Sequence, residues 1–419
     1  MNTSEKLAIL GGDKSVDVPK PHYVWPEITD RTREAVLKQL DSTISIYNKS
    51  DIFERFENNF AKYHGRKYAL LHNSGTNAIW SMFVGCDLQP GDEVICPTYT
   101  FHATATPLLQ TGATPIFVDA KEDGNIDPEK IRAAITKKTK AIIITHMWGI
   151  PCDMDEIVAI AKEAGVYLLE DCSHAHGAEY KGRKVGTFGD AAAWSLQGQK
   201  TVTGGEGGIV LTGNEEIHIR ELLLGHYNKR CTQEIPKDHR LRQFALTGFG
   251  LKNRAHPLAI AIAQEQFERL DSILEFRRRY AEMMMNELGG FEEISLPNTK
   301  ERLPSWYAFT IQYHEEKAGV KIEKFYQALQ AEGLAEADRP GSTGPIHDLP
   351  LFQNRHIVYP HLYRQTETTS SEYPQAVNFW KKAIKFPVWH RPEDEGMTRD
   401  YIKGVKKVLT NLPSLKDNA

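Results

Sequence analysis

From about residue 67 to 212, short apolar runs alternate with stretches in which apolar residues have helical spacing. The runs have the length and composition of buried strands and lie at 67–72, 92–97, 115–120, 140–146 and 166–171. The stretches between them predict helices, notably at 74–86, 100–112 and 153–165. Short apolar strands that alternate with helices predict an α/β fold, in which helices cover both faces of a large, mostly parallel sheet.

The stretch 153–165 predicts a helix together with both of its ends. Asp153 precedes it as a capping residue, with Glu156 three positions later, and Gly165 is placed to end it. Its apolar residues share one face and are Ile157, Val158, Ile160, Ala161 and Ala164.

After about residue 260 the pattern becomes that of a smaller α+β unit. A long helix is predicted over 258–290, a lone strand over 307–313 and a helix over 322–332. A last helix is predicted over 397–409, with Thr398 as its cap.

We therefore expect two domains. The large domain covers 1–262 and includes the N-terminal segment, and the small C-terminal domain covers 263–419. Residues 336–377 are rich in Pro, Gly, Ser, His and Thr and predict a long irregular segment. Since such segments in compact proteins are often functional, we expect this one to form a loop on the substrate side.

Composition narrows the class of protein. The chain of 419 residues is 41% hydrophobic and 25% charged, with a net charge of −4, which argues against nucleic acid or an acidic membrane surface as a partner. No stretch is long and apolar enough for a signal peptide or a membrane span. Five cysteines without a C-x-x-C pair disfavour a disulfide framework and zinc, so we expect a cytoplasmic protein without a metal.

Ligands of open α/β sheets bind beyond the carboxyl ends of the strands, so residues at those ends carry the candidate chemistry. Ser74, Gly75 and Thr76 follow the first strand and open a helix, whose free N–H groups suit an anion. A plain helix cap explains the same residues. Asp171 ends a buried strand, which requires a partner for its carboxylate, and a helix cap or a buried salt bridge is the alternative.

A lysine completes this set. The run 191–194 leads to Ser195 and, five residues later, to Lys200, before the glycine-rich stretch 203–208. An anion cradle, a carboxylate and a lysine are what pyridoxal 5'-phosphate needs: the lysine forms a Schiff base with its aldehyde, and the carboxylate keeps its pyridine nitrogen protonated. We expect the glycines to leave room for the cofactor ring beside Lys200.

At this point the sequence resembles a known family. The stretches SGTNA, GDEVICPTYTF, GATPIFVD, HMWGIPCDMDEI, EDCSHAHGA, GTFGDAAAWSLQGQKTVTGGEGG and GLKNRAHPLA occur in this order. They are similar to the sugar and cyclitol aminotransferases of the DegT/DnrJ/EryC1/StrS group, which are fold-type I pyridoxal phosphate enzymes. The similarity runs from about residue 30 to 400. The N-terminal LAILGG resembles members that act on cyclitol ketones or aminobenzoate precursors.

The resemblance implies a role for each matching position. Lys200 forms the Schiff base, and Asp171 pairs with the pyridinium. Gly75, Thr76 and Ser195 bind the phosphate, next to Ser74. The same comparison places Phe101 as the aromatic that stacks on the ring and His174 near the phenolic oxygen of the cofactor, although both are also explained as core residues. The remaining histidines in these motifs have no assigned role.

One position departs from the family pattern. Many members have Asn-Tyr-Arg where this chain has Lys252-Asn253-Arg254, and that Asn reaches the phosphate from the neighbouring subunit. The resemblance therefore implies a homodimer with shared active sites, in which Lys252 replaces the Asn. The alternative for Lys252 is an ordinary surface lysine.

These observations predict an aminotransferase that moves an amino group from glutamate or glutamine to a keto-sugar or keto-cyclitol, in secondary-metabolite or surface-sugar biosynthesis. Three alternatives stay open. A dehydratase or cyclising enzyme of the same family is disfavoured by Lys200, since the dehydratases we compare have His there. A non-catalytic ligand sensor is disfavoured by the intact lysine and carboxylate. A nicotinamide-binding enzyme lacks the expected glycine fingerprint.

Overall fold

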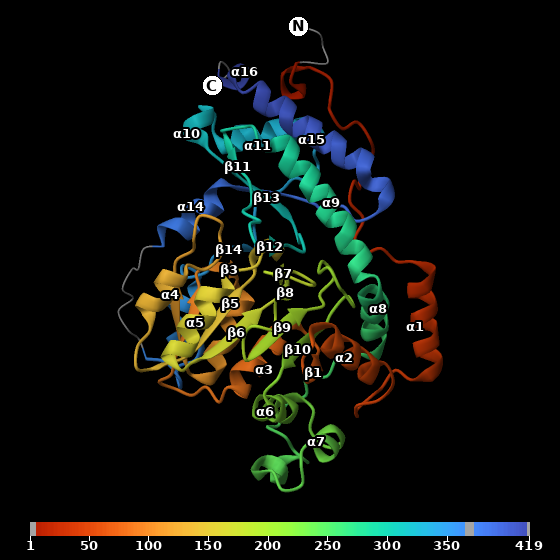
Figure 1. The fold of residues 1–419 in the computed structure, drawn as a ribbon, viewed down its shortest axis with the longest axis vertical. Coiled ribbons are helices and arrows are strands. Elements are labelled where there is room, and N and C mark those ends of the chain that lie inside the picture. Colours follow the sequence, from red (N-terminus) through yellow and green to blue (C-terminus); the bar gives the residue numbers. More distant parts are fainter. Residues whose placement is uncertain (1–5, 365–372, 417–419) are drawn as a thin grey trace.

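The structure, a computed structural model, describes residues 6–364 and 373–416 (Figure 1). Its centre is a seven-stranded sheet in the order β1-β10-β9-β6-β5-β2-β4. The strands are β1 (Tyr68–His72), β2 (Glu93–Pro97), β4 (Thr114–Val118), β5 (Thr139–Thr145), β6 (Tyr167–Asp171), β9 (Ala191–Ser195) and β10 (Gly208–Thr212). Six of these strands run in the same direction and only β10 runs opposite to them, which confirms the predicted α/β fold and the predicted strands.

Helices cover both faces of this sheet, and alternate residues of each strand pack against opposite layers. In β9, Ala192 and Trp194 pack with α2 (Asp51–His64) and α8 (Pro257–Glu268). Ala191 and Ala193 pack on the other face with α3 (Gly75–Gly85). The predicted helix 153–165 is α5 (Met154–Ala164), which packs against β5 through Ile157 and Ile160. Further helices around this sheet are α1 (Asp30–Ser42), α4 (Pro128–Ala134), α6 (Glu215–Gly225) and α7 (Lys229–Glu234).

The C-terminal part has its own core around a three-stranded antiparallel sheet, β11 (Ile294–Ser295), β13 (Phe309–Tyr313) and β15 (Ala383–Phe386). The strand predicted to stand alone is β13, which pairs on both sides. The surrounding helices are α9 (Leu270–Leu288), α10 (Glu315–Ala318), α11 (Ile322–Ala331), α14 (Pro374–Lys382), α15 (Glu395–Thr410) and α16 (Pro413–Lys416). Leu7 and Val16 of the N-terminal segment also pack in this core. The domain boundary at 262/263 stays a prediction.

Two predicted helices differ from those observed. The helix expected over 258–290 is interrupted at Arg269, whose backbone leaves the helical conformation with φ −97° and ψ 0°, so α8 and α9 are separate. The Arg269 guanidinium pairs with Glu27 and Glu265. Over 100–112 the chain finishes β3 (Tyr99–Phe101) and forms two short 3₁₀ helices. Pro107 lacks the N–H that a continuous helix would need.

Two predicted helix caps are wrong. Thr398 lies inside α15, where its hydroxyl donates to the Asp394 carbonyl at 3.1 Å. Asp153 stands at the start of α5 but caps no N–H with its side chain. Its carboxylate pairs instead with Lys121 and Arg302, because these cations offer a stronger partner than a backbone amide.

The segment 336–377 has regular structure where it is described. It contains β14 (Thr343–Pro345), which pairs with β3, the short helices α12 (Pro350–Gln353) and α13 (Arg355–Val358), and the start of α14. Ile346, Phe352 and Tyr363 are buried against the large sheet. Residues 365–372 of the predicted loop lie outside the described part. A third small sheet joins β7 (Glu179–Tyr180), β8 (Arg183–Lys184) and β12 (Arg302–Leu303).

The five cysteines are free and buried, as expected without a disulfide framework. No helix within the described residues is long and apolar enough to cross a membrane.

Candidate active site

A cavity of about 370 Å³ lies at the carboxyl ends of β6 and β9 and the N-terminus of α3. The predicted cofactor residues that line it are Ser74, Gly75, Thr76, Phe101, Asp171, His174, Ser195 and Lys200. The parallel pairing of β6 with β9 brings Asp171 opposite Ala193, two residues before Ser195. The sheet order therefore assembles residues that are more than 100 positions apart in the chain.

The N-terminus of α3 forms one wall of the cavity. The Ser74 hydroxyl accepts a hydrogen bond from the Asn77 N–H at 3.1 Å and so caps the helix, as the plainer interpretation of this residue predicted. A Cβ on Gly75 would lie 2.6 Å from the Ser195 Cβ, so only glycine lets the helix approach β9 this closely. Since the first N–H groups of a helix have no intrahelical acceptor, this end of α3 suits a phosphate.

Asp171 provides the negative charge of the site. Its side chain is 5% exposed. One carboxylate oxygen accepts a hydrogen bond from the Thr104 hydroxyl at 2.6 Å, and the other accepts one from the Ser173 N–H at 3.0 Å. The described residues include no cation within ion-pair distance of this carboxylate. A protonated pyridine nitrogen would supply that missing positive partner, so Asp171 fits the cofactor.

Lys200 provides the amine. Its Nζ lies 4.7 Å from the centroid of the Tyr307 ring. Burial lowers the pKa of Lys200 to about 8, while the charge of Asp171 acts in the opposite direction. The Lys200 carbonyl accepts a hydrogen bond from the Trp25 Nε1 at 3.1 Å, which fixes the backbone at this position. Because this pKa lies near neutral pH, a useful fraction of Lys200 is the unprotonated amine, which is the form that attacks an aldehyde.

The glycines after Lys200 serve a different purpose from the one the sequence predicted. None of the glycines between residues 203 and 208 lines the cavity. A Cβ on Gly204 would lie 2.3 Å from the Ala259 carbonyl oxygen of α8, and one on Gly208 would lie 2.3 Å from the Ser74 carbonyl oxygen. These glycines therefore permit close backbone packing around the site.

His174 lies in an aromatic stack beside the cavity. Its ring is 4.0 Å from the Tyr307 ring with an interplanar angle of 8°, and Trp148 stacks at 5.6 Å. Burial, with a contribution from the charge of Lys200, keeps the pKa of His174 well below its usual value. Its buried Nδ1 has no hydrogen-bond partner among the described residues. This nitrogen is free to bond an oxygen of the cofactor.

Two of the predicted cofactor residues have fewer contacts with the rest of the site within a single chain. Phe101 lines the cavity from the end of β3, but its side chain is 38% exposed and contacts the His102 ring. Lys252 is exposed and does not line the cavity, and its backbone pairs with His226. Both assigned roles stay predictions.

Sequence reasoning missed several residues that shape the cavity. The sequence predicts Thr104 in the middle of the helix 100–112 and Tyr307 at the start of the strand 307–313, far along the chain from the other site residues. The hydroxyls of Thr100, Thr104 and Thr145 bond one another at 2.8–3.2 Å around Asp171. Residues 340–343, in the segment predicted to form a substrate-side loop, also line the cavity. The available signal for the hydroxyl network was the occurrence of threonines at or near strand ends, since Thr100 lies in β3 and Thr145 ends β5.

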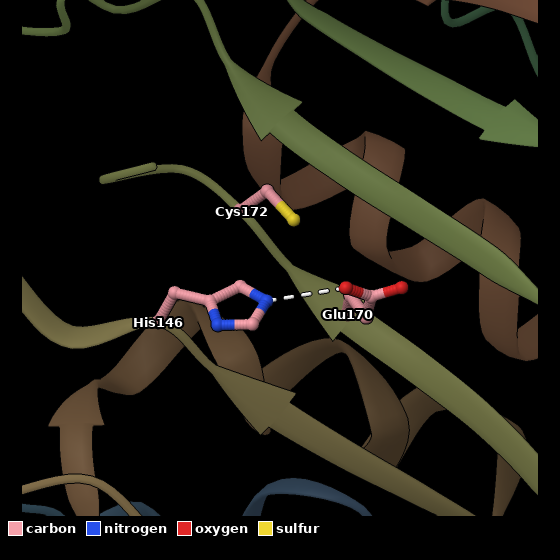
Figure 2. A group of neighbouring side chains, drawn as sticks. All are labelled: His146, Glu170 and Cys172. Atoms are coloured by element: carbon pink, nitrogen blue, oxygen red, sulfur yellow. Dashed lines mark hydrogen bonds and ion pairs between the residues drawn. The ribbon is translucent and has the colours of Figure 1, made fainter. Parts of the chain in front are cut away.

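A second polar cluster (Figure 2) is formed by His146, Glu170 and Cys172. The His146 Nε2 lies 3.2 Å from Glu170, and its Nδ1 accepts from the Cys152 N–H. Glu170 also accepts hydrogen bonds from the backbone N–H groups of residues 186, 188 and 189 at 2.6–2.8 Å. Because His146 and Glu170 bond each other and Glu170 bonds the loop amides, we interpret this pair as structural support for the loop 186–189.

Comparison with known proteins agrees with this geometry. The model of the DegT/DnrJ/EryC1/StrS aminotransferase family matches residues 26–400. A putative L-glutamine:3-amino-2,3-dideoxy-scyllo-inosose aminotransferase of Micromonospora echinospora is 32% identical, with 99% of each chain covered. The GDP-perosamine synthase of Escherichia coli O157:H7 is 33% identical over 80% of this chain and 88% of its own. An aminotransferase structure from Psychrobacter cryohalolentis superposes with a TM-score of 0.82 and 26% identity, covering 94% of this chain and all of the other.

The chain belongs to the DegT/DnrJ/EryC1/StrS aminotransferase family. It is a pyridoxal phosphate-dependent aminotransferase of fold type I. The cavity fits this cofactor through three independent features. They are the first N–H groups of α3, which have no intrahelical acceptor, the Asp171 carboxylate, which has no cation among the described residues, and the His174 Nδ1, which has no hydrogen-bond partner there.

The lowered pKa of Lys200 yields a first prediction. In the cofactor-free protein, the neutral amine fraction should rise about tenfold per pH unit and level off above pH about 8. Competitive acetylation, read at Lys200 by mass spectrometry across the pH range, measures this break. Asp171→Asn should move it to lower pH, because the carboxylate favours the protonated amine. Asp155→Asn, at an exposed site, should leave it in place. Reactivity that still climbs tenfold per unit from pH 9 to 10 would contradict the assignment.

Proposed function

We propose that this enzyme transfers an amino group from glutamine or glutamate to the carbonyl carbon of a keto-cyclitol or keto-sugar, in secondary-metabolite or surface-sugar biosynthesis. The observation that carries the proposal is the presence of Lys200 and Asp171 in one cavity beside the anion-binding end of α3. The names of the two relatives support it, since one states a glutamine donor and an inosose acceptor. The free, buried cysteines support a reducing compartment, which we propose to be the cytoplasm.

Each residue then has a task. Pyridoxal phosphate, when bound, supplies an electron sink for the carbon that gains or loses the amino group. Ser195 and the N–H groups of Gly75 and Thr76 would hold its phosphate. Asp171 would keep a proton on its ring nitrogen. Lys200 Nζ would take the proton that leaves the donor carbon and deliver one to the acceptor carbon in the second half of the reaction, acid–base work worth about 10²–10⁴ in rate.

The surrounding residues keep these groups in position. The Thr104 hydroxyl fixes the Asp171 carboxylate, and the Tyr307 ring lies against the Lys200 amine. An intact lysine also favours transamination over the dehydratase alternative. The same lysine, with its carboxylate, speaks against a non-catalytic sensor.

A donor scan tests the proposed reaction. Glutamine or glutamate should remove the visible absorbance of the bound cofactor, and a keto-cyclitol or keto-sugar should restore it. Lys200→Ala should keep the fold but lose multiple turnover, because no group remains to move the proton. If neither donor changes the absorbance while another amine does, the proposed donor is wrong. If the absorbance changes but none of these ketones restores it, the proposed acceptor class is wrong.

We also propose a homodimer with shared active sites. The segment between α6 and α8 projects from the large domain, with α7 at its tip (Figure 1). It exposes apolar side chains at Phe244, Leu246, Phe249 and Leu251, directly before Lys252. Such an exposed patch is typical of an interface. A lysine carried on this segment would reach the phosphate of the neighbouring subunit.

Mixed dimers test this arrangement. Lys252→Ala alone should weaken cofactor binding by roughly ten- to a hundredfold, since it removes a charge-assisted contact. At limiting cofactor, Lys200→Ala subunits are combined with Lys252→Ala subunits. If Lys252 acts across the interface, each mixed dimer has one site with both lysines, and activity returns. If mixing restores no activity, Lys252 does not act across the interface.

A further inference from the structure

A second cavity of about 420 Å³ adjoins the active site. Trp148, Gln199, Tyr307 and Lys385 line both cavities, so they form the partition between them. The Tyr307 ring contacts the Lys200 amine from this partition. The second cavity, which we call the aromatic chamber, has the size of a small-molecule site.

Aromatic side chains from distant parts of the chain build the walls of the aromatic chamber. They are Tyr23 and Trp25 of the N-terminal segment, Trp148, Tyr307, Tyr326 and Phe386. Three of them are held by hydrogen bonds: Trp25 donates to the Lys200 carbonyl, Tyr23 accepts from Arg277 at 2.8 Å, and Tyr326 donates to the Ala337 carbonyl at 3.3 Å. These rings present flat apolar faces that are fixed before a ligand arrives.

The charged groups of the aromatic chamber are Glu336, Asp338 and Lys385. Lys385 is already paired with Asp338 at 2.9 Å, and their backbones form a β-bridge. The Glu336 carboxylate accepts one hydrogen bond from the described residues, a long one of 3.3 Å from the His22 N–H. Arg277 lies behind Trp25 and does not line the chamber. The lining thus carries one carboxylate charge that no cation balances.

We propose that the aromatic chamber binds the hydroxyl-bearing edge of the acceptor ring that lies away from its carbonyl carbon, and that this acceptor is a polyhydroxylated ring without phosphate. The inference rests on the proposed function and selects one of its acceptor classes, the keto-cyclitol. Hydroxyl groups donate strong hydrogen bonds to a carboxylate such as Glu336. The C–H faces of the ring pack on the aromatic walls. A nucleotide diphosphate would meet two carboxylates and a lysine that is already paired.

Kinetics with defined ketones test this assignment. Glu336→Ala and Tyr326→Ala remove contacts from different walls, and each should raise KM for scyllo-inosose at least tenfold. Conversion of the cofactor by glutamine should keep its wild-type rate in both variants, since the donor does not need the chamber. Glu323→Ala, at an exposed position of α11, is the matched control and should change neither value. An unchanged KM in both chamber variants, or a lower KM for a nucleotide-linked keto-sugar, would overturn the proposal.

A binding measurement separates this proposal from the proposed function. Titration calorimetry of the holoenzyme with inositol, which has no carbonyl, should show binding that Glu336→Ala weakens at least tenfold, and uridine diphosphate should not displace the inositol. Absence of inositol binding, or displacement by uridine diphosphate, overturns the chamber assignment. If inositol binds as expected but no donor converts the cofactor, the proposed reaction is wrong and the binding site stands.

Discussion

The burial of an amine and a carboxylate in one cavity is the constraint on which this structure depends. Removing either charge from water costs several kcal/mol unless a partner compensates, so the surrounding protein must hold both groups against that cost. Thr104 and the Ser173 N–H bond the Asp171 carboxylate, and the lowered pKa of Lys200 reduces the charge that has to be buried. Lys200 is therefore a reactive amine, and the Asp171 carboxylate lacks a cation among the described residues, which the ring nitrogen of a bound cofactor would supply.

Neighbouring residues of one strand divide the structural and chemical work. Asp171 ends β6 and faces the cavity, while Glu170, one position earlier, points to the opposite face. There Glu170 binds His146 and the N–H groups of the loop 186–189. This loop leads directly into β9, the strand that ends at Ser195. A buried carboxylate that binds only protein thus fixes the strand that positions Ser195 and leads to Lys200.

The sequence predicted those features that local pattern determines. Buried strands are predicted from apolar runs such as 166–169, and the residues at their carboxyl ends converge because parallel strands share one edge. It did not predict features that arise from tertiary contacts. Thr104 is part of a hydroxyl network, Tyr307 lines the site from the loop before β13, and the glycines near Lys200 permit close backbone packing against Ala259 and Ser74. The role proposed for Lys252 requires a second subunit, which a single chain does not include, so it stays a prediction.

Lys200 is the central claim, and borohydride reduction of the holoenzyme tests it most directly. Reduction should fix the cofactor covalently to one tryptic peptide, with the added mass on Lys200, and Lys200→Ala should retain the cofactor only reversibly. Covalent label on Lys252, Lys385 or any other lysine of the wild-type protein, with Lys200 unmodified, would contradict the account.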